Sequence, residues 1–306
     1  MQRPTNPAEH DREVEDGLRA VGRFMRERLR ASPLASLDFD FDHFLAGGKM
    51  LRGRAAFRIG PAAGAPRDAL LRCAAAVEMV HAASLLHDDV IDGGQVRRGS
   101  PAFWIGQGAS GAILVGDLLI CQALELLMEL PHRAASDLLI RMTGEMCRAE
   151  TEQELLLRGR PTDWETGVRL ARSKTGSLFA FVAEACADGA PAALRAALRE
   201  AGYLAGTAYQ LSDDILDLTV DTDAAGKTLG LDAVRAKGTS ATARPGDYGL
   251  SLEMLGALRE RSFEGLRPWP AVERAWREYW ERDLGPALAQ NVGGAAAAVA
   301  ASEVPA

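Results

Sequence analysis

Two stretches of this sequence end a long apolar run with the same cluster of carboxylates. They read Asp88-Asp89-Val90-Ile91-Asp92 and Asp213-Asp214-Ile215-Leu216-Asp217. Residues four apart share one face of a helix, so Asp88 and Asp92 can hold one ion between them, whereas Asp89 points elsewhere. Three carboxylates beside Leu85 and Leu86 would repel one another if partly buried, which indicates that a cation normally lies there. The motifs predict two long helices with acidic carboxyl ends.

The recurrence of the motif is what favours a metal site. Alone, one such motif is more often a solvated helix end or a helix cap. Two of them, each embedded in apolar sequence, can close a cluster of hard cations from opposite walls of a cavity. Magnesium fits best, because it prefers carboxylate oxygens and keeps coordination positions open for phosphate oxygens.

The length and composition of the chain allow a large buried core. The chain has 306 residues, of which 47% are hydrophobic. A chain of this length often forms about two domains, but no linker separates two halves. We expect one domain over residues 1–306, with an alanine-rich tail that frays over residues 290–306. The cysteines at positions 73, 121, 147 and 186 form no CxxC pair, so we expect reduced core thiols rather than a zinc site or disulfides.

No segment predicts secretion or a membrane span. Residues 1–15 are polar and of mixed charge, which excludes a secretory signal, and no apolar run approaches the roughly 20 residues that span a bilayer. We expect a soluble, cytoplasmic protein. The net charge of −7 argues against a nucleic-acid partner, because a polyanion would be repelled except at a local basic patch. Any phosphate site has to be built locally.

Lysine is rare in this sequence, and its positions are informative. Of the 35 basic residues only four are lysine, namely Lys49, Lys174, Lys227 and Lys237. An ammonium group is a compact, freely rotating point charge, which suits close contact with phosphate differently from the planar guanidinium of arginine. The pattern indicates lysines kept for phosphate contact, with codon bias as the alternative, above all for Lys237.

The periodicity of helices runs through nearly the whole sequence. Apolar positions recur at helical spacing over residues 8–30, 69–91, 112–130, 134–157, 164–186, 191–217, 250–258 and 272–288, and no segment alternates with a period of two for long. A mostly solvated acidic face is expected for Glu145, Glu150, Glu152, Gln153 and Glu154. The pattern predicts an all-α fold, an antiparallel helical bundle around a central cavity into which functional side chains project.

Basic residues beside glycines provide candidate anion sites in two places. In GGKMLR (residues 47–52), the glycines allow a tight turn, and Lys49 and Arg52 would lie three apart on one helix face, a clamp for an anion at a helix start. In RRGSP (residues 97–101), adjacent arginines of an extended chain point to opposite sides and could bind two different anions. The alternatives are an ordinary turn and a solvated basic loop.

With these motifs in view, the sequence resembles the trans-isoprenyl diphosphate synthases, the head-to-tail enzymes that elongate polyprenyl diphosphates. The resemblance runs from about Phe44 to Lys237. It is carried, in matching order, by GGKMLR (47–52), EMVH (78–81), LLHDDVID (85–92), RRGSP (97–101), GD (116–117), KTGSL (174–178), GTAYQLSDDILD (206–217) and GK (226–227), then by residues 232–237. It implies the isoprenoid synthase fold and, by family expectation, a homodimer.

The resemblance also implies roles for individual residues. Asp88, Asp92 and Asp213 would bind about three magnesium ions per active site, with Asp89, Asp214 and Asp217 in support. The diphosphate of the allylic substrate would be held by Arg97, Lys174, Thr175 and Lys227, with Gln210 nearby; that of isopentenyl diphosphate would be held by Lys49, Arg52, His81 and Arg98, and Lys237 matches the lysine of a loop after the second motif. His81 is seven residues before Asp88 and faces the same way, which favours a site over a core histidine.

The reaction of this family explains why such residues are needed. Diphosphate leaves the allylic substrate once magnesium, lysine and arginine neutralise its charge, and the alkene of isopentenyl diphosphate attacks the remaining allylic cation. The released diphosphate can accept the final proton, so no histidine base is required. Ala83 and Ser84 lie just before the first motif, along the path of the growing tail, and these small side chains favour products of geranylgeranyl length or longer.

Two other functions remain open. A class I terpene cyclase also ionises a diphosphate with magnesium but needs no second diphosphate site, and a non-catalytic subunit of a heteromeric prenyl synthase could dispense with one acidic motif. The sequence also departs from the family pattern in places. Gly53 stands where proline is usual, Gly93 and Gly94 follow the first motif, and residues 238–245 replace the usual apolar helix.

Overall fold

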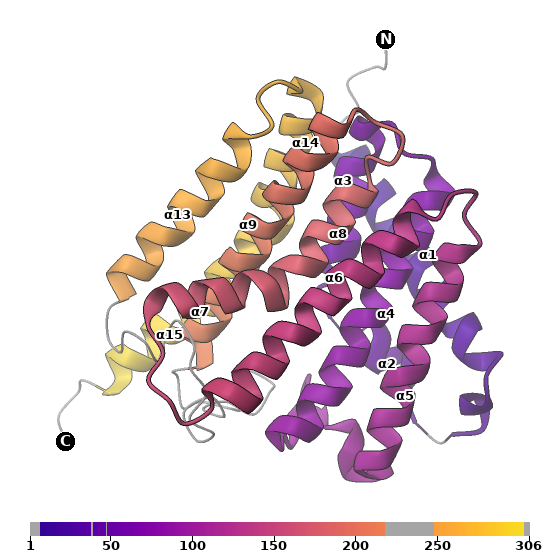
Figure 1. The fold of residues 1–306 in the computed structure, drawn as a ribbon, viewed down its shortest axis with the longest axis vertical. Coiled ribbons are helices and arrows are strands. Elements are labelled where there is room, and N and C mark those ends of the chain that lie inside the picture. The colour runs from indigo at the N-terminus through magenta and orange to yellow at the C-terminus, as the bar shows by residue number, and fades with distance from the viewer. Residues whose placement is uncertain (1–6, 38, 47, 218–247, 303–306) are drawn as a thin grey trace.

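Helices form nearly all the regular structure of the computed structural model, which describes residues 7–37, 39–46, 48–217 and 248–302 (Figure 1). The α-helices are α1 (Pro7–Arg30), α2 (Phe41–Ala46), α3 (Leu51–Ala63), α4 (Arg67–Asp92), α5 (Phe103–Met128), α6 (Ala134–Thr151), α7 (Trp164–Ala171), α8 (Ser177–Ala185), α9 (Ala192–Asp217), α13 (Tyr248–Glu264), α14 (Pro270–Tyr279) and α15 (Gly285–Ser302). A 3-10 turn, η1 (Pro33–Ser36), and three π-helical turns, η2 (Glu152–Leu157), η3 (Arg172–Gly176) and η4 (Trp280–Leu284), join them, and β1 (Val96–Arg97) pairs with β2 (Ser100–Pro101). The predicted all-α helical bundle is confirmed.

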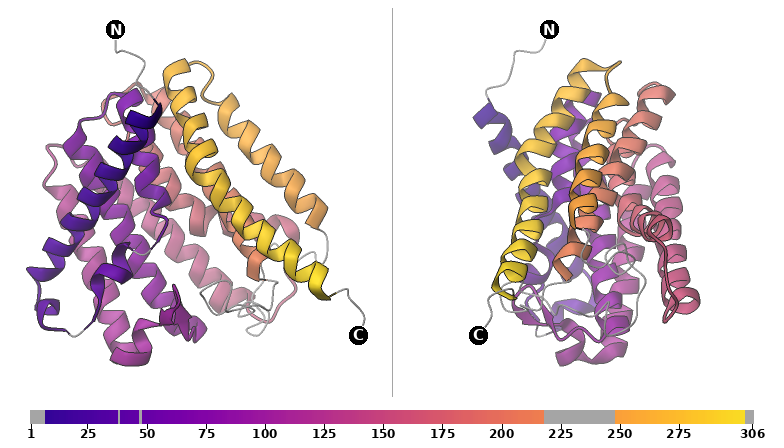
Figure 2. Two further views of the ribbon diagram at one scale, coloured as in Figure 1. Left: turned by 180° about the vertical axis from the view of Figure 1, so that it is seen from behind. Right: turned by 90° about the vertical axis from the view of Figure 1, so that its left-hand side faces the viewer.

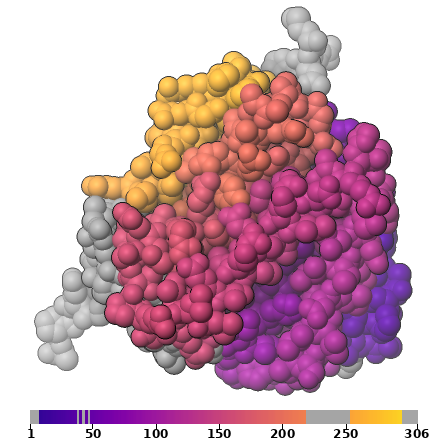
Figure 3. Space-filling model, viewed as in Figure 1, coloured from indigo at the N-terminus to yellow at the C-terminus, as the bar shows by residue number. Residues whose placement is uncertain are grey.

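The two helices that carry the aspartate motifs, α4 and α9, occupy the middle of the bundle. α8 contacts both of them, α1, α3 and α5 pack around α4, and α13 and α15 pack on α9 (Figure 2). The carboxyl ends of α4 and α9 both lie toward the lower end of the bundle in Figure 1. In the space-filling view, the surface of α4 is recessed between α5 and α6 toward that end (Figure 3). The two acidic motifs therefore share one end of the molecule.

The helices α8 and α9 approach closely because two glycines line their contact. Gly202 and Gly206 are four residues apart and share one face of α9. A Cβ atom added at Gly202 would lie 2.6 Å from Ala180 Cα, and one added at Gly206 would lie 2.6 Å from Gly176 Cα. Gly176 belongs to η3, the turn that also carries Lys174. The glycine face thus sets the distance between the helix of the second motif and predicted substrate-binding residues.

Two helices have the length and hydropathy of a membrane span, contrary to the expectation that no apolar run approaches that length. They are α4 and α5, and their most apolar windows are 67% and 44% buried inside the protein. A helix that is apolar all round belongs to a protein core, which accounts for α4. α5 instead leaves Ile113, Leu114 and Met128 exposed on its outer face. Packing in the bundle explains the hydropathy of α4, whereas α5 keeps an uncovered apolar face.

One predicted helix boundary is corrected by the structure, and the C-terminal tail is helical for most of its length. α5 begins at Phe103 rather than at residue 112, and Gly108 lies inside it in a non-helical conformation (φ 75°, ψ 161°). The glycines of this stretch made it look like a loop in the sequence. α15 continues to Ser302, within the tail over residues 290–306 that is expected to fray, and the fraying stays a prediction. Alanine is the strongest helix former, which explains why the alanine-rich end stays helical.

The four cysteines are of two kinds, which corrects the prediction that all are core thiols. Cys73 and Cys186 are buried, whereas Cys121 and Cys147 are exposed. Burial raises the pKa of the Cys73 thiol to about 12, and it raises the pKa of Cys186 as well. The buried pair is therefore protonated and unreactive near neutral pH.

Candidate active site

The first aspartate motif occupies the last turn of α4. Gly93, in the left-handed conformation (φ 70°), ends the helix directly after Asp92. Asp88 and Asp92 are partly exposed, whereas Asp89 is only 2% exposed. The buried carboxylate forms an ion pair with Arg97, whose Nε donates a hydrogen bond to Asp89 Oδ1 at 3.1 Å. The two aspartates predicted to bind metal thus stay accessible, while Asp89 holds a basic side chain in place.

A tight hairpin presents the two adjacent arginines. Its strands pair Arg97 with Ser100, and both turn residues, Arg98 and Gly99, have positive φ (54° and 73°). Such a turn matches the twist of paired strands. The sequence analysis expected Arg98 in an extended chain, but the residue lies in the turn. Its Nη1 donates a hydrogen bond to the Phe44 carbonyl. The two arginines have different partners, Asp89 for Arg97 and the Phe44 carbonyl for Arg98, because the turn separates their side chains.

Arg97 lies within reach of both aspartate motifs. Burial lowers the pKa of Arg97, whereas its hydrogen bond to Asp89 and the charge of that residue raise it. The charges of Asp88 and Asp213 raise it further, above the ordinary value. The charges of Asp88 of α4 and Asp213 of α9 therefore both act on the Arg97 guanidinium.

The second aspartate motif is tied to the turn η3. Gln210 Nε2 donates a hydrogen bond to Asp214 Oδ1 at 2.7 Å, along one turn of α9. The Thr175 hydroxyl of η3 donates to Gln210 Oε1. Asp214 is buried, whereas Asp213 and Asp217 are partly exposed. The hydrogen bonds thus connect predicted substrate-binding residues to the buried carboxylate, while the other two carboxylates stay accessible.

Lys174 contacts two side chains from the stretch that was expected to be mostly solvated. Its Nζ donates to Gln153 Oε1 at 2.7 Å and forms an ion pair with Glu150. Gln153 was expected on a solvated face, but its side chain is buried, with only 4% exposed. Lys174 and Gln153 lie in the π-helical turns η3 and η2, where the wider turn shifts side chains around the helix. A regular helical periodicity misplaces both residues, so this contact could not be predicted from the sequence.

A second group of basic residues gathers near the start of α3, and we call Arg52, His81 and Arg98 the α3 basic cluster. Burial lowers the pKa of His81 well below its ordinary value, and the charges of Arg52 and Arg98 lower it further. The imidazole is therefore neutral near pH 7 and offers one N–H donor. The guanidinium of Arg52 lies over the ring of Phe179, 4.7 Å from its centroid. The cluster brings together three of the residues predicted to bind the second diphosphate.

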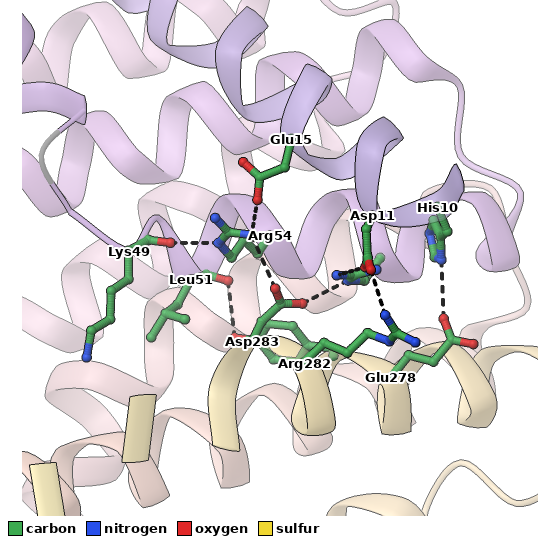
Figure 4. Close-up of polar contacts among 11 residues, drawn as sticks. His10, Asp11, Glu15, Lys49, Leu51, Arg54, Glu278, Arg282 and Asp283 are labelled. Carbon is green, nitrogen blue, oxygen red and sulfur yellow. Dashed lines mark hydrogen bonds and ion pairs between the residues drawn. The ribbon is translucent and has the colours of Figure 1, made fainter. Parts of the chain in front are cut away.

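Lys49 lies outside α3, which corrects the predicted clamp on one helix face. The N-cap of α3, Met50, is in the left-handed conformation (φ 45°), so the chain turns sharply between Lys49 and Arg52. Arg54 Nε donates to the Lys49 carbonyl at 2.9 Å, and Arg54 also pairs with Asp283 of η4. Figure 4 shows the Lys49 side chain extending away from these contacts. Lys49 is an exposed residue, and its backbone carbonyl is held by Arg54.

An ion-pair network joins the start of α3 to both α1 and η4 (Figure 4). The buried Asp283 carboxylate accepts from Arg58 Nε at 2.8 Å and from Arg54 Nη1 at 3.3 Å. Asp11 of α1 forms ion pairs with Arg58 and with Arg282, each at 2.6 Å. Removing one partner of a buried pair leaves an uncompensated charge, which is strongly destabilising. The network therefore fixes the segment that contains Lys49 and Arg52 from the C-terminal part of the bundle.

The remaining predicted residues fall into two groups. Ala83 has no exposed surface, and Ser84 Oγ donates to the His81 carbonyl at 2.9 Å within α4. Lys227 and Lys237 lie outside the described residues, so the roles expected of them stay predictions.

The donor set of the two motifs fits a hard divalent cation. Within residues 7–37, 39–46, 48–217 and 248–302, no group of three or more His, Cys, Asp or Glu side chains is placed to hold a metal ion unaided. Asp88, Asp92 and Asp213 offer only carboxylate oxygens, which Mg²⁺ and Ca²⁺ prefer and softer metals do not. A cation at either motif would need further oxygen ligands, and a bound diphosphate supplies them.

Comparison with known proteins identifies the class of enzyme as a prenyltransferase. A family model described as polyprenyl synthetase matches residues 37–244, a range that contains both aspartate motifs, the hairpin and η3. The chain belongs to the polyprenyl synthetase family.

Individual relatives differ in the product that each is named for. The chain is 33% identical to a geranylgeranyl diphosphate synthase of Methanosarcina mazei over 219 residues, which cover 69% of this chain and 67% of the relative. It is 33% identical to an octaprenyl diphosphate synthase of Haemophilus influenzae over 195 residues, 63% of this chain and 59% of that relative. It is 36% identical to heptaprenyl diphosphate synthase component 2 of Geobacillus stearothermophilus over 168 residues, 54% of this chain and 52% of the relative. The chain thus spans less than two thirds of the last two relatives.

A solved structure extends the similarity over nearly the whole chain. It is the crystal structure of a polyprenyl synthase from Caulobacter crescentus complexed with calcium and isoprenyl diphosphate. The two chains are 27% identical and superpose with a TM-score of 0.66, over 96% of this chain and 98% of the other.

Proposed function

We propose that this chain condenses isopentenyl diphosphate with an allylic diphosphate and releases diphosphate and a longer trans-polyprenyl diphosphate. The observation that carries the proposal is that the carboxyl ends of α4 and α9, which hold the two aspartate motifs, lie at one end of the bundle, where Arg97 pairs with Asp89. This arrangement offers one diphosphate a guanidinium and carboxylates from both motifs for cations. The α3 basic cluster is available for a second diphosphate. Condensation of two diphosphate substrates needs two such sites.

The allylic diphosphate would lie between the two aspartate motifs. Asp88, Asp92 and Asp213 would hold magnesium, about three ions as the resemblance implies, which neutralises the leaving diphosphate as the carbon–oxygen bond breaks. Arg97 and Lys174 would orient this diphosphate through charge-assisted hydrogen bonds. The departed diphosphate can accept the proton that the product loses, so no side chain is assigned as base.

Isopentenyl diphosphate would be bound by Lys49 and the α3 basic cluster. The forked guanidinium groups of Arg52 and Arg98 match the oxygens of a phosphate, and neutral His81 donates one hydrogen bond without adding charge. Holding the diphosphate in this way fixes the alkene relative to the allylic carbon, and such positioning accounts for a large share of rate enhancement. The small side chains of Ala83 and Ser84 support a product of geranylgeranyl length or longer.

The test of this proposal is product analysis of the purified protein. It is incubated with magnesium, isopentenyl diphosphate and, in separate reactions, dimethylallyl, geranyl or farnesyl diphosphate, and the products are separated by chromatography. We expect isopentenyl diphosphate to be consumed only when an allylic diphosphate and magnesium are both present. Loss of the allylic diphosphate while isopentenyl diphosphate persists would instead identify a terpene cyclase. No turnover of either diphosphate would favour a non-catalytic subunit. A relative named heptaprenyl diphosphate synthase component 2 is consistent with such a role.

We also propose a homodimer formed through the outer face of α5. Leu114, Cys121 and Met128 are exposed and seven residues apart, so they lie along one stripe of the helix. A contiguous exposed apolar surface marks an association site, and two copies of one helix can pack across a twofold axis. Light scattering should give about twice the chain mass of 32.7 kDa. Leu114→Arg should give monomers, whereas Leu155→Arg, on the exposed surface of η2, should not; a dimeric Leu114→Arg variant would contradict this interface.

A further inference from the structure

The helix α3 begins without a cap of its own. Its N-cap residue, Met50, has a left-handed conformation and makes no side-chain hydrogen bond to the helix. The first four N–H groups of a helix have no partner within the helix and need acceptors from elsewhere. The amide of Gly53, in the first turn, donates to Glu78 Oε1 at 2.8 Å. Glu78 belongs to α4, so the cap of α3 comes from the neighbouring helix.

The same carboxylate lies beside the α3 basic cluster. Glu78 is only 6% exposed, and the charges that act on it most strongly are those of Arg52 and Arg98. Burial raises the pKa of Glu78, and the charge of Arg52 and the amide of Gly53 oppose that rise. A buried carboxylate persists only where charges and hydrogen bonds compensate its lost hydration. Glu78 therefore caps the first turn of α3, the turn that carries Arg52, and its charge offsets that of the guanidinium.

The buried Arg52 side chain has a hydrogen-bond donor that no described residue satisfies. Its side chain is buried, and its guanidinium stacks on Phe179. Its Nε has no hydrogen-bond partner among the residues that the structure describes. An unsatisfied buried donor is unfavourable, by about 1–3 kcal/mol in general, and an anionic ligand oxygen would satisfy it. The Nε of Arg52 is thus available to donate a hydrogen bond to the oxygen of a bound anion.

Residue 53 makes this cap specific to the present chain. Gly53 stands where the family resemblance leads one to expect proline. Proline has no N–H and could not donate to Glu78. A side chain at this position would also be tight, because a Cβ atom added at Gly53 would lie 3.1 Å from Leu18 Cδ2. Glycine therefore provides both the donor and the space that the contact with Glu78 needs.

We propose that Glu78 is a positioning residue for the binding of isopentenyl diphosphate, acting by capping α3 through the Gly53 amide and so fixing the turn that carries Arg52. The inference rests on the proposed function, because it assigns Arg52 to that diphosphate. Glu78 itself is a carboxylate and would repel the diphosphate, so it acts through Arg52 and not by contact.

Position 53 offers a pair of substitutions that isolate the hydrogen bond. Gly53→Pro removes the N–H, and proline is tolerated in the first turn of a helix, where that N–H has no partner within the helix. Gly53→Ala keeps the N–H and is the matched control for crowding against Leu18. Calorimetry would measure the affinity of each variant for isopentenyl diphosphate alone. We expect Gly53→Pro to bind about tenfold more weakly than Gly53→Ala, the scale of one hydrogen bond to a charged group.

Steady-state kinetics separates positioning from a general loss of structure. We expect Gly53→Pro and Glu78→Leu to raise the KM for isopentenyl diphosphate, with little change in the KM for the allylic substrate. The double variant should be scarcely worse than the poorer single variant, because both substitutions remove the hydrogen bond from the Gly53 amide to Glu78. Equal affinity of the proline and alanine variants, or equal rises in both KM values, would overturn the proposal. If the unaltered protein bound no isopentenyl diphosphate, the proposed function itself would fail instead.

Discussion

Gln210 donates a hydrogen bond of 2.7 Å to Asp214 and accepts one from Thr175, so a single amide connects the second aspartate motif to η3. Gln210→Leu keeps the approximate size of the side chain but leaves the buried Asp214 without this donor. Loss of a hydrogen bond to a buried charged group is worth about 1.5–3 kcal/mol. We expect kcat to fall by about tenfold or more, with little change in the KM for isopentenyl diphosphate. Gln290→Leu, on the exposed surface of α15, is the matched control, and an equal kcat in the two variants would refute the assignment.

The metal assignment predicts the effect of removing one carboxylate from each motif. Asp88→Ala and Asp213→Ala each remove an accessible carboxylate near Arg97, and both should lower turnover by at least about a hundredfold, because charge neutralisation of the leaving group is lost. Asp137→Ala removes an exposed carboxylate from the first turn of α6 and should leave turnover close to the unaltered rate. Initial rates at saturating magnesium would measure all three variants. A near-normal rate in either motif variant would contradict the assignment.

Local periodicity predicted the helices and the shared faces well. The spacing of apolar residues over 69–91 and 191–217 predicted α4 and α9, and the spacing of Asp88 and Asp92 predicted that both lie on one face at a helix end. These features depend on contacts within one helix, where each residue's direction follows from its position. The role of Arg97 came from the family resemblance, and the structure adds its ion pair with Asp89.

Features that depend on distant contacts or unusual turns were not predictable. Lys49 was expected on a helix face, but the left-handed Met50 places it before the helix, and a single sequence gives little sign of such a turn. The capping of α3 by Glu78 joins residues 25 positions apart, and Glu78 appeared in the sequence only as part of a family motif. The burial of Gln153 follows from the π-helical turn η2, which breaks the regular periodicity on which the prediction relied.

Replacing a crowded glycine and an uncrowded glycine by alanine should change the free energy of unfolding in opposite directions. Gly206→Ala would place a Cβ atom 2.6 Å from Gly176 Cα, so α8 and η3 must move away. Overpacking of this kind lowers the free energy of unfolding by about 1–3 kcal/mol. Gly256→Ala, in α13 with open space around it, should instead raise stability by about 0.5–1 kcal/mol, because alanine is the better helix former. Urea titration of both variants measures the difference, and a Gly206→Ala variant as stable as the unaltered protein would show that the helices are not so closely packed.

The cysteines predict a graded pattern of alkylation. In the native protein near pH 8, iodoacetamide should modify Cys147 but leave Cys73 and Cys186 unmodified, because burial raises the pKa values of both buried thiols. Cys147 should react more slowly than a free thiol, since partial burial and then the charge of Glu150 raise its pKa. All four should react in denaturant. Mass spectrometry of the peptides reads out each site. Labelling of Cys73 as fast as Cys147 would contradict the core, and protection of Cys121 would support the α5 interface.

The proposed product length predicts the effect of added bulk before the first motif. Ala83→Phe and Ser84→Phe place an aromatic ring where the growing tail is expected to pass, so both should shorten the main product by at least one isoprene unit. Ala83 is fully buried and its replacement risks overpacking, whereas Ser84 is partly exposed, so the second variant keeps the test informative if the first fails to fold. Ser84→Ala removes only the hydroxyl that bonds to the His81 carbonyl and should leave product length unchanged. Chromatography of the products, with melting temperatures as a check on folding, measures the outcome. If both folded phenylalanine variants made products as long as those of the unaltered protein, the tail would have to extend past a different part of α4.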